Sequence, residues 1–139
     1  METKIILTDE GFELKDFLYS ETAKRNKIPD QNCITVKTLN RIDQLHSKVL
    51  APLKQKYKDL TITSGYRSIW TNAAVGGVPN SQHQYGEAAD IKCKNMTALW
   101  YDILNLDIDQ AIRYKNYIHV SYVSNSLNRN QFIDKTLNK

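Results

Sequence analysis

The spacing of apolar residues predicts one long amphipathic helix in the first half of the chain. From Thr35 onward, apolar side chains recur every three or four positions, at Leu39, Ile42, Leu45, Val49, Leu50 and Leu53. This spacing places them on one face of an α-helix. Pro52 lies within the pattern. Because proline lacks a backbone N–H and crowds the preceding turn, we expect it to kink or restart the helix.

Four shorter helices are predicted around this long one. Residues 12–18 carry apolar side chains at helical spacing, and Ser20 can cap a second short helix that ends at Pro29. Residues 69–74 are predicted as a third helix. Thr97 can cap a fourth, which carries Leu99, Trp100, Ile103 and Leu104.

Strands are predicted mainly in the second half of the chain. Residues 60–63 alternate between apolar and polar side chains, which indicates a half-buried strand. Three more strands are predicted at residues 88–92, 109–114 and 117–123, with Lys115-Asn116 joining the last two. A long helix followed by strands and tight turns indicates an α+β fold with a small antiparallel sheet and helices packed on it.

The chain is expected to form a single domain over residues 1–139. No internal repeat and no linker rich in proline, glycine or serine divides it. Residues 125–139 are polar and are predicted as a C-terminal tail. We expect the protein to be a monomer.

Composition excludes several classes of protein. Lysine and arginine number 19 and aspartate and glutamate 15, so the formal net charge is +4. The two signs are interspersed, whereas nucleic-acid binding calls for a denser basic stripe. No apolar run approaches the roughly 20 residues of a membrane-spanning helix, and the first ten residues lack the pattern of a secretory signal. We therefore expect no nucleic-acid partner, no membrane insertion and synthesis in the cytoplasm, with Cys33 and Cys93 as buried, reduced thiols.

Histidine is the residue type that points to chemistry. His46 lies among polar residues of the long helix and is expected on its surface. His83 follows a loop with two glycines and a proline, and His119 shares one face of its strand with Ser121. Two of the three histidines are therefore predicted at positions where a strand or a tight turn directs the side chain.

A carboxylate accompanies His83 at short spacing. Gly86 and two alanines separate His83 from Asp90, so the backbone can turn closely and enter a strand with Asp90 directed back toward the imidazole. With His119 this makes a possible two-histidine, one-carboxylate site. Zn²⁺ accepts these ligands, and three protein ligands leave a fourth position for water, as in catalytic sites. A hydrogen-bonded pair without metal is the alternative interpretation.

The combined motifs resemble a known family. Ser81-x-His83-x-x-Gly86-x-Ala88-x-Asp90, the upstream Ser64-Gly65-Tyr66-Arg67-Ser68 and the later Ile118-His119-Val120 resemble the peptidase M15 family of zinc D-Ala-D-Ala carboxypeptidases and phage L-Ala-D-Glu endolysins. The loop at 72–81 is similar to the branch common in phages and gut bacteria. The resemblance implies the hedgehog/DD-peptidase fold and His83, Asp90 and His119 as zinc ligands. It also implies that Arg67 reaches the substrate carboxylate or the developing oxyanion.

Elementary chemistry agrees with these roles. Zinc lowers the pKa of a bound water to about 7 and polarises a peptide carbonyl, so hydrolysis can proceed near neutral pH. Arg67 would supply a fixed cation for charge that grows in the transition state, and a strand-end salt bridge is its alternative role. Ser81 is expected either to orient His83 and contribute to substrate binding, or to cap the loop.

One position departs from the family pattern. Many active relatives carry an acid three residues before the last zinc histidine, and this chain has Asn116 there. An amide does not take up a proton at neutral pH. Either another carboxylate serves as catalytic base, with Glu87 and Asp109 the nearest candidates, or turnover is slow, or the fold is kept for binding.

These observations lead to three hypotheses. The first is a zinc peptidase acting on the peptide stem of peptidoglycan, in a phage lysis or virion protein or in a bacterial wall-remodelling enzyme. Such a protein would act at the cell wall after release or within a virion. The second is a catalytically silent, zinc-containing binding or virion structural domain, and the third is a metal-free signalling domain of the hedgehog type.

Overall fold

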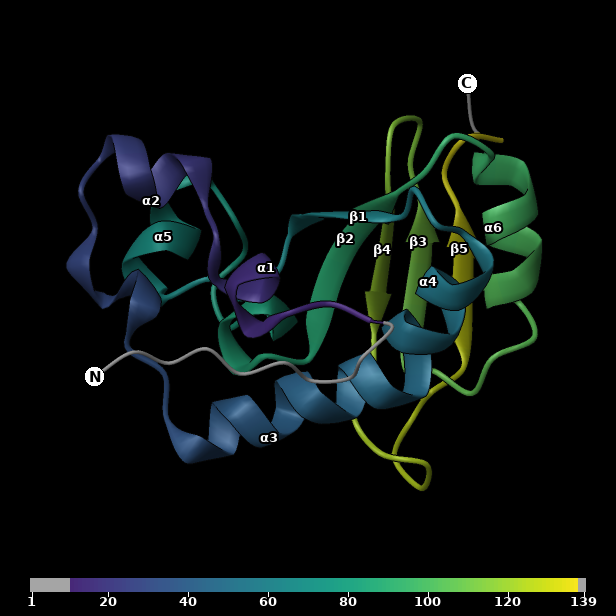
Figure 1. Ribbon diagram of the computed structural model, residues 1–139, viewed down its shortest axis with the longest axis horizontal. Coiled ribbons are helices and arrows are strands. Elements are labelled where there is room, and N and C mark those ends of the chain that lie inside the picture. Colours follow the sequence, from purple (N-terminus) through teal and green to yellow (C-terminus); the bar gives the residue numbers. More distant parts are fainter. Residues whose placement is uncertain (1–10, 138–139) are drawn as a thin grey trace.

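One five-stranded sheet with helices packed against it organises the chain (Figure 1). The computed structural model describes residues 11–137. Within them the first half is helical, and the elements run α1 (Leu14–Leu18), α2 (Glu21–Arg25), η1 (Pro29–Asn32), α3 (Val36–Leu45), η2 (His46–Leu50) and α4 (Ala51–Lys56). The second half contains β1 (Thr61–Ser64), α5 (Ile69–Ala74), η3 (Gln82–Tyr85), β2 (Ala88–Lys92), α6 (Met96–Ile103), β3 (Gln110–Arg113), β4 (Ile118–Ser121) and β5 (Gln131–Asp134). The predicted α+β class is confirmed.

The long helix begins and breaks as its sequence predicts. The Thr35 hydroxyl accepts a hydrogen bond from the Thr38 backbone N–H at 3.1 Å and caps α3. The helix widens into the π-helical segment η2 and resumes as α4, with Pro52 in the first turn of α4. A π-helical turn lengthens the hydrogen-bonded ring. It therefore accommodates a proline, which cannot donate a backbone hydrogen bond to the turn before it.

The sheet has the strand order β1-β2-β4-β3-β5. All pairs are antiparallel except β3 with β5, which run parallel, so the sheet is mixed rather than purely antiparallel as predicted. The parallel strand arises from the segment that the sequence predicts to be a polar tail. Phe132 of β5 packs edge-to-face on Trp100 of α6, with ring centroids 6.5 Å apart. Pairing with β3 and the contact between Arg113 and Asp134 hold the strand as well.

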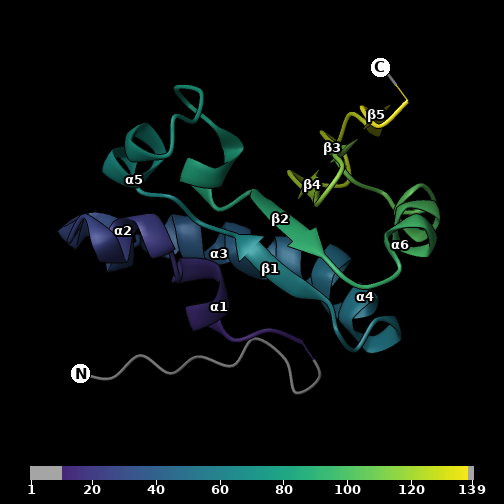
Figure 2. The ribbon, with the colours of Figure 1, turned by 90° about the horizontal axis from the view of Figure 1, so that it is seen from above.

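The core lies on one face of the sheet. Side chains of α1, α3, η2 and α4, among them Phe17, Ile42, Leu45 and Val49, pack against Ala89 and Ile91 of β2 and Ile118 and Val120 of β4. Figure 2 shows α1, α3 and α4 on one side of β1 and β2, with α5 and the η3 segment on the other side. Because strand residues alternate between faces, Asp90 and His119 point away from this core.

Three details differ from the sequence-based expectations. His46 is not on the surface but fully buried beside Phe12 and Phe17. It lies four residues after Ile42 and three before Val49, which places it on the apolar face of the long helix although its sequence neighbours are polar. Cys33 is exposed and Cys93 is half-buried, since both lie in connecting segments rather than on a core face. Asn95, not Thr97, caps α6 by accepting the Ala98 N–H at 3.1 Å.

No helix within residues 11–137 has both the length and the apolar character needed to cross a membrane.

Candidate metal centre

The pairing of β2 with β4 brings the first two site residues together. Asp90 and His119 are direct partners in this antiparallel ladder, so both side chains project from the same face. His119 Nδ1 lies 3.0 Å from Asp90 Oδ1. The sequence predicts each strand, and the register between them determines this contact.

A short 3₁₀ turn delivers His83 to the same place. The Ser81 hydroxyl accepts the His83 backbone N–H at 3.2 Å and caps η3. Gly86 ends the turn with φ +77°, and a Cβ there would lie 2.9 Å from the Thr38 carbonyl oxygen. Only glycine satisfies both the left-handed conformation and this close approach. The turn places His83 Nε2 3.3 Å from Asp90 Oδ1.

A backbone carbonyl orients the His83 ring. His83 Nδ1 lies 2.7 Å from the Gly65 carbonyl oxygen. Because a carbonyl oxygen only accepts, Nδ1 carries a proton, and Nε2 is the ring nitrogen that faces Asp90. A histidine that binds a metal commonly donates its other ring N–H in this way. Gly65 follows β1, so the Ser64–Ser68 motif supplies a backbone group as well as Arg67.

Together these contacts form a three-residue cluster that could hold a metal ion. Ligand atoms of His83, Asp90 and His119 all lie within 4.8 Å of one another. Burial alone would raise the pKa of Asp90, but hydrogen bonds from His119 and His83 hold that pKa well below its ordinary value. An ionised carboxylate beside two imidazoles is a donor set that Zn²⁺ accepts. The residues therefore fit the zinc ion that the sequence predicts.

Arg67 lies at the edge of the cluster and is held on several sides. Its Nε donates to Ser64 Oγ at 3.1 Å and its Nη1 to Asn72 Oδ1 at 3.3 Å. Its Nη2 lies 3.5 Å from Asp90 Oδ2. These partners fix the planar guanidinium, so its cation stays beside the cluster at little further cost in conformational entropy.

The cluster opens into a cleft of about 570 Å³. Among the described residues that line it, Asp90 is the one carboxylate, and Arg67 and Arg129 are the cations. Ser81 also lines the cleft. The cleft can therefore receive an anionic substrate next to a metal-binding cluster.

Comparison with known sequences identifies the family to which this site belongs. Residues 15–121 match the Peptidase M15 family. The chain belongs to the peptidase M15 family. It is also 50% identical over 34 residues to the zinc D-Ala-D-Ala carboxypeptidase of Streptomyces albus G. That match covers 24% of this chain and 13% of the relative, so the chain spans a small part of that relative's length. The observed α+β arrangement agrees with the M15 peptidase fold.

The two carboxylates predicted as alternative bases lie outside the lining of the cleft of this M15 chain. Glu87 Oε2 is 3.7 Å from Arg41 Nε, and Glu87 Oε1 is 3.5 Å from the side-chain amide of Gln82. Asp109 is buried and accepts two hydrogen bonds from the Arg129 guanidinium. These hydrogen bonds lower the pKa of Asp109 to about 2. Each carboxylate thus has an arginine partner.

Asn116, at the position where many M15 peptidases carry an acid, lies in the exposed turn between β3 and β4. It does not belong to the lining of the cleft. Its neighbour Tyr117 does line the cleft, stacked on Tyr114 with ring centroids 4.7 Å apart.

Several residues of the cleft could not be found from the sequence. Tyr114 and Tyr117 belong to a hairpin that a strand pattern predicts, but their stacking depends on the turn. Gln82 lies next to His83, and its amide donates to Asp109 Oδ2 at 2.9 Å. Arg129 comes from the predicted tail. No motif marks any of these residues, because tertiary contacts alone bring them to the cleft.

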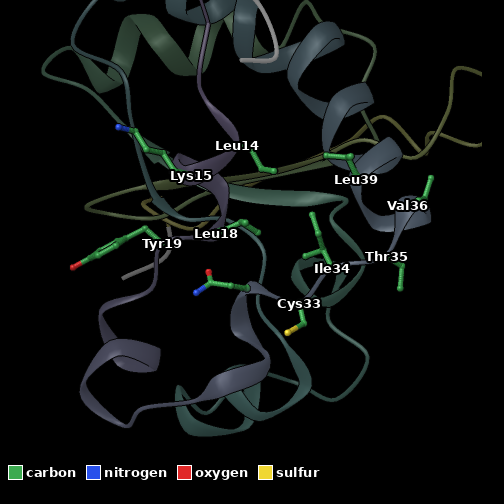
Figure 3. Close-up of a pocket in the computed structure, with 10 residues that line it drawn as sticks. Leu14, Lys15, Leu18, Tyr19, Cys33, Ile34, Thr35, Val36 and Leu39 are labelled. Atoms are coloured by element: carbon green, nitrogen blue, oxygen red, sulfur yellow. The ribbon is translucent and has the colours of Figure 1, made fainter. Parts of the chain in front are cut away.

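A second cavity, of about 610 Å³, lies apart from the metal-binding cluster. Figure 3 shows it between α1 and the start of α3, with Leu14, Leu18, Ile34 and Leu39 among its lining residues. Neither histidine nor carboxylate appears among its described lining residues, and Cys33 is its one thiol. It therefore lacks the groups that a hydrolytic reaction requires.

Proposed function

We propose that this M15 chain is a zinc peptidase that cleaves the peptide stem of bacterial peptidoglycan. The observation that carries the proposal is the His83–Asp90–His119 cluster with Arg67 beside it in an open cleft. The family, and the similarity to the zinc D-Ala-D-Ala carboxypeptidase of Streptomyces albus G, support the same reaction class. The proposal includes the setting in which the chain acts, as a phage lysis or virion protein or as a wall-remodelling enzyme.

Each residue of the cluster has a separate part in this function. His83, Asp90 and His119 would hold zinc, which when bound polarises the scissile carbonyl and activates water. The Gly65 carbonyl keeps His83 in one tautomer, so its Nε2 is available as a ligand. Asp90 supplies the negative charge that partly offsets the cation.

Arg67 would bind the substrate carboxylate or the developing oxyanion. Ser64 and Asn72 hold two of its nitrogens, so the guanidinium is fixed before substrate arrives. A preorganised cation stabilises transition-state charge without reorganising at the moment of reaction. Ser81 would contribute to the site through the η3 cap that positions His83.

A carboxylate that serves as catalytic base is proposed from Glu87 and Asp109. The hydrogen bonds from Arg129 lower the pKa of Asp109 to about 2, so Asp109 takes up a proton poorly near neutral pH. Glu87 makes a longer contact with Arg41 at 3.7 Å. Replacing each by its amide, Glu87→Gln and Asp109→Asn, separates them: loss of a working base lowers kcat by about 100-fold or more.

The direct test is hydrolysis of purified peptidoglycan by the zinc-loaded protein. We expect new amine termini, which disappear after treatment with a chelator and return when zinc is added. Arg67→Lys keeps the charge but loses the forked geometry, so it should lower activity while zinc stays bound. If zinc-loaded protein releases no amine termini from any peptidoglycan, the enzymatic proposal is wrong.

A second candidate function is a zinc-containing binding domain without catalysis. It is favoured by one observation: Asp90 is the sole carboxylate among the described residues that line the cleft. Asn116→Asp tests it, because a restored base should raise activity by on the order of 100-fold. Asn125→Asp adds the same charge at another exposed asparagine and serves as control. The second candidate would be supported if the Asn116→Asp variant hydrolyses peptidoglycan while the unaltered chain and the Asn125→Asp variant do not.

A further inference from the structure

Arg129 belongs to the cleft although it lies outside the part of the chain that matches the M15 family. The family match ends at residue 121. Arg129 follows in the connection between β4 and β5, and it lines the same cleft as His83, Asp90 and His119. Its side chain is 55% exposed, so a ligand in the cleft can reach it.

A buried carboxylate holds this arginine in place. Asp109, whose side chain is 3% exposed, accepts hydrogen bonds from Arg129 Nε at 3.0 Å and Arg129 Nη2 at 2.8 Å. It also accepts the Arg129 backbone N–H at 3.1 Å and the Gln82 amide at 2.9 Å. An exposed arginine with a flexible side chain contributes little to binding, because binding must restrict its conformational freedom. A two-point contact with a buried carboxylate removes most of that freedom before the ligand arrives.

The pairing leaves hydrogen-bond donors on the exposed side of the guanidinium. An arginine side chain carries five N–H donors, and the contacts with Asp109 use one on Nε and one on Nη2. Within residues 11–137 no protein acceptor is recorded for the other three. These three donors are suited to a second carboxylate, because a planar guanidinium can bind one carboxylate along each of two edges.

Arg129 and Arg67 approach the cluster from opposite edges of the sheet, on the same face. Arg67 follows β1, at one edge of the strand order, whereas Arg129 precedes β5, at the other edge. The metal-binding residues of β2 and β4 lie between them. Asp109 immediately precedes Gln110, which pairs with Ser121, two residues from His119. At about 3.4 Å per residue, this places the Arg129 end of the cleft roughly 7 Å or more from His119 along the strand.

We propose that Arg129, positioned by Asp109, binds a second carboxylate of the substrate, on the side of the scissile bond away from Arg67. The proposal rests on the function proposed above and specifies its substrate: a peptide with an anionic group within a few residues of the bond that is cleaved. Peptidoglycan stems meet this requirement when their glutamate is joined through its side chain, because its α-carboxylate then stays free. In this proposal Asp109, both of whose oxygens accept hydrogen bonds from Arg129, acts on the substrate through Arg129 as a positioning residue and not as the catalytic base.

Matched substrates test the proposal. Two synthetic stem peptides are compared that differ only in this group, one with the glutamate α-carboxylate and one with the carboxamide. The zinc-loaded chain should cleave the acid form with a kcat/KM about 10-fold or more above that for the amide, mostly through KM. Arg129→Gln should remove this preference by lowering kcat/KM for the acid form, and Arg129→Lys should restore part of it.

Arg113→Gln is the matched control. Arg113 also pairs with an aspartate of the C-terminal segment, Asp134, at 3.4 Å, but it does not line the cleft. Its replacement should leave the acid-to-amide ratio unchanged. A purely structural role for Arg129 would instead lower kcat/KM for both peptides by the same factor and leave their ratio intact, which would overturn the proposal.

Binding separates this proposal from the proposed peptidase function. If neither peptide is hydrolysed, calorimetric titration of both into the zinc-loaded chain still reports the preference. Tighter binding of the acid form that disappears in Arg129→Gln would support the role of Arg129 while contradicting the peptidase proposal. Hydrolysis with equal kcat/KM for the two peptides in the unaltered chain would support the peptidase and contradict the role of Arg129.

Discussion

The two faces of the sheet use the same residue type for opposite purposes. On the cleft face, His83 and His119 share the Asp90 carboxylate, at 3.3 and 3.0 Å. On the core face, His46 is buried beside the rings of Phe12 and Phe17, and its Nε2 accepts the Phe12 backbone N–H at 2.7 Å. Only the first environment places a carboxylate in direct contact with the imidazoles.

This difference shows what makes a histidine available to a metal. Burial lowers the pKa of His46, so it stays neutral and acts as a hydrogen-bonded part of the core. The cleft face instead brings together an ionised carboxylate, two imidazoles and the Arg67 cation. Burying such a set costs free energy unless it has a strong partner. A bound divalent cation would offset that free-energy cost on the cleft face, whereas it would not stabilise the core face.

The largest expected effect is the loss of zinc from the cleft face. His119→Ala removes one of the three proposed ligands, so zinc affinity should fall by more than about 100-fold. Measuring bound metal per chain after dialysis against a weak chelator checks this. One zinc per chain in the variant would mean that another ligand set, for example one using Cys93, holds the metal.

The core-face histidine should show the opposite behaviour. His46→Ala opens a cavity and leaves the Phe12 N–H without its acceptor, so the free energy of unfolding should fall by about 2–4 kcal/mol. Bound zinc per folded chain should stay at one, which a denaturant titration and metal analysis of the same samples would show. Loss of zinc without loss of stability would break the distinction between the two faces.

Metal removal should destabilise the chain through the cleft face. Zinc at 100 times its dissociation constant would stabilise the folded state by about 2.7 kcal/mol, because binding favours the state that holds the site together. Thermal unfolding with zinc and with chelator measures the difference. The same comparison in His119→Ala should give no shift, and an equal shift in both proteins would contradict the assignment of the site.

Acid should act on the pair that positions Arg129. Hydrogen bonds from Arg129 lower the pKa of Asp109 to about 2 in the folded chain, from 3.8. A carboxyl with a lowered pKa adds stability that is present above pH 4 and is lost as the pH falls toward 2. The shift corresponds to about 2 kcal/mol. The difference in unfolding free energy between the unaltered chain and Asp109→Asn should therefore shrink over that pH interval, and a constant difference would contradict the pairing.

Sequence patterns predict the elements of this protein well where local physics decides them. The cap at Ser20, the restart at Pro52 and the strand at residues 88–92 all appear as expected. Local spacing indicates that His83 and Asp90 can meet, because the intervening Gly86 permits the turn that joins them, and the resemblance to the M15 family implied their role as ligands. His119 lies on its strand where alternation places it.

Tertiary structure alone decided the remaining features. The register of β2 against β4 puts His119 opposite Asp90, and no local property of either strand specifies that pairing. His46 lies on the apolar face of the long helix, but the hydrogen bond that its Nε2 accepts from the Phe12 backbone N–H joins segments 34 residues apart. Arg129 reaches the cleft through Asp109, 20 residues earlier in the chain. The sequence by itself determined which residues could perform chemistry, and long-range packing determined which of them meet, because contacts between distant segments depend on the whole folded chain.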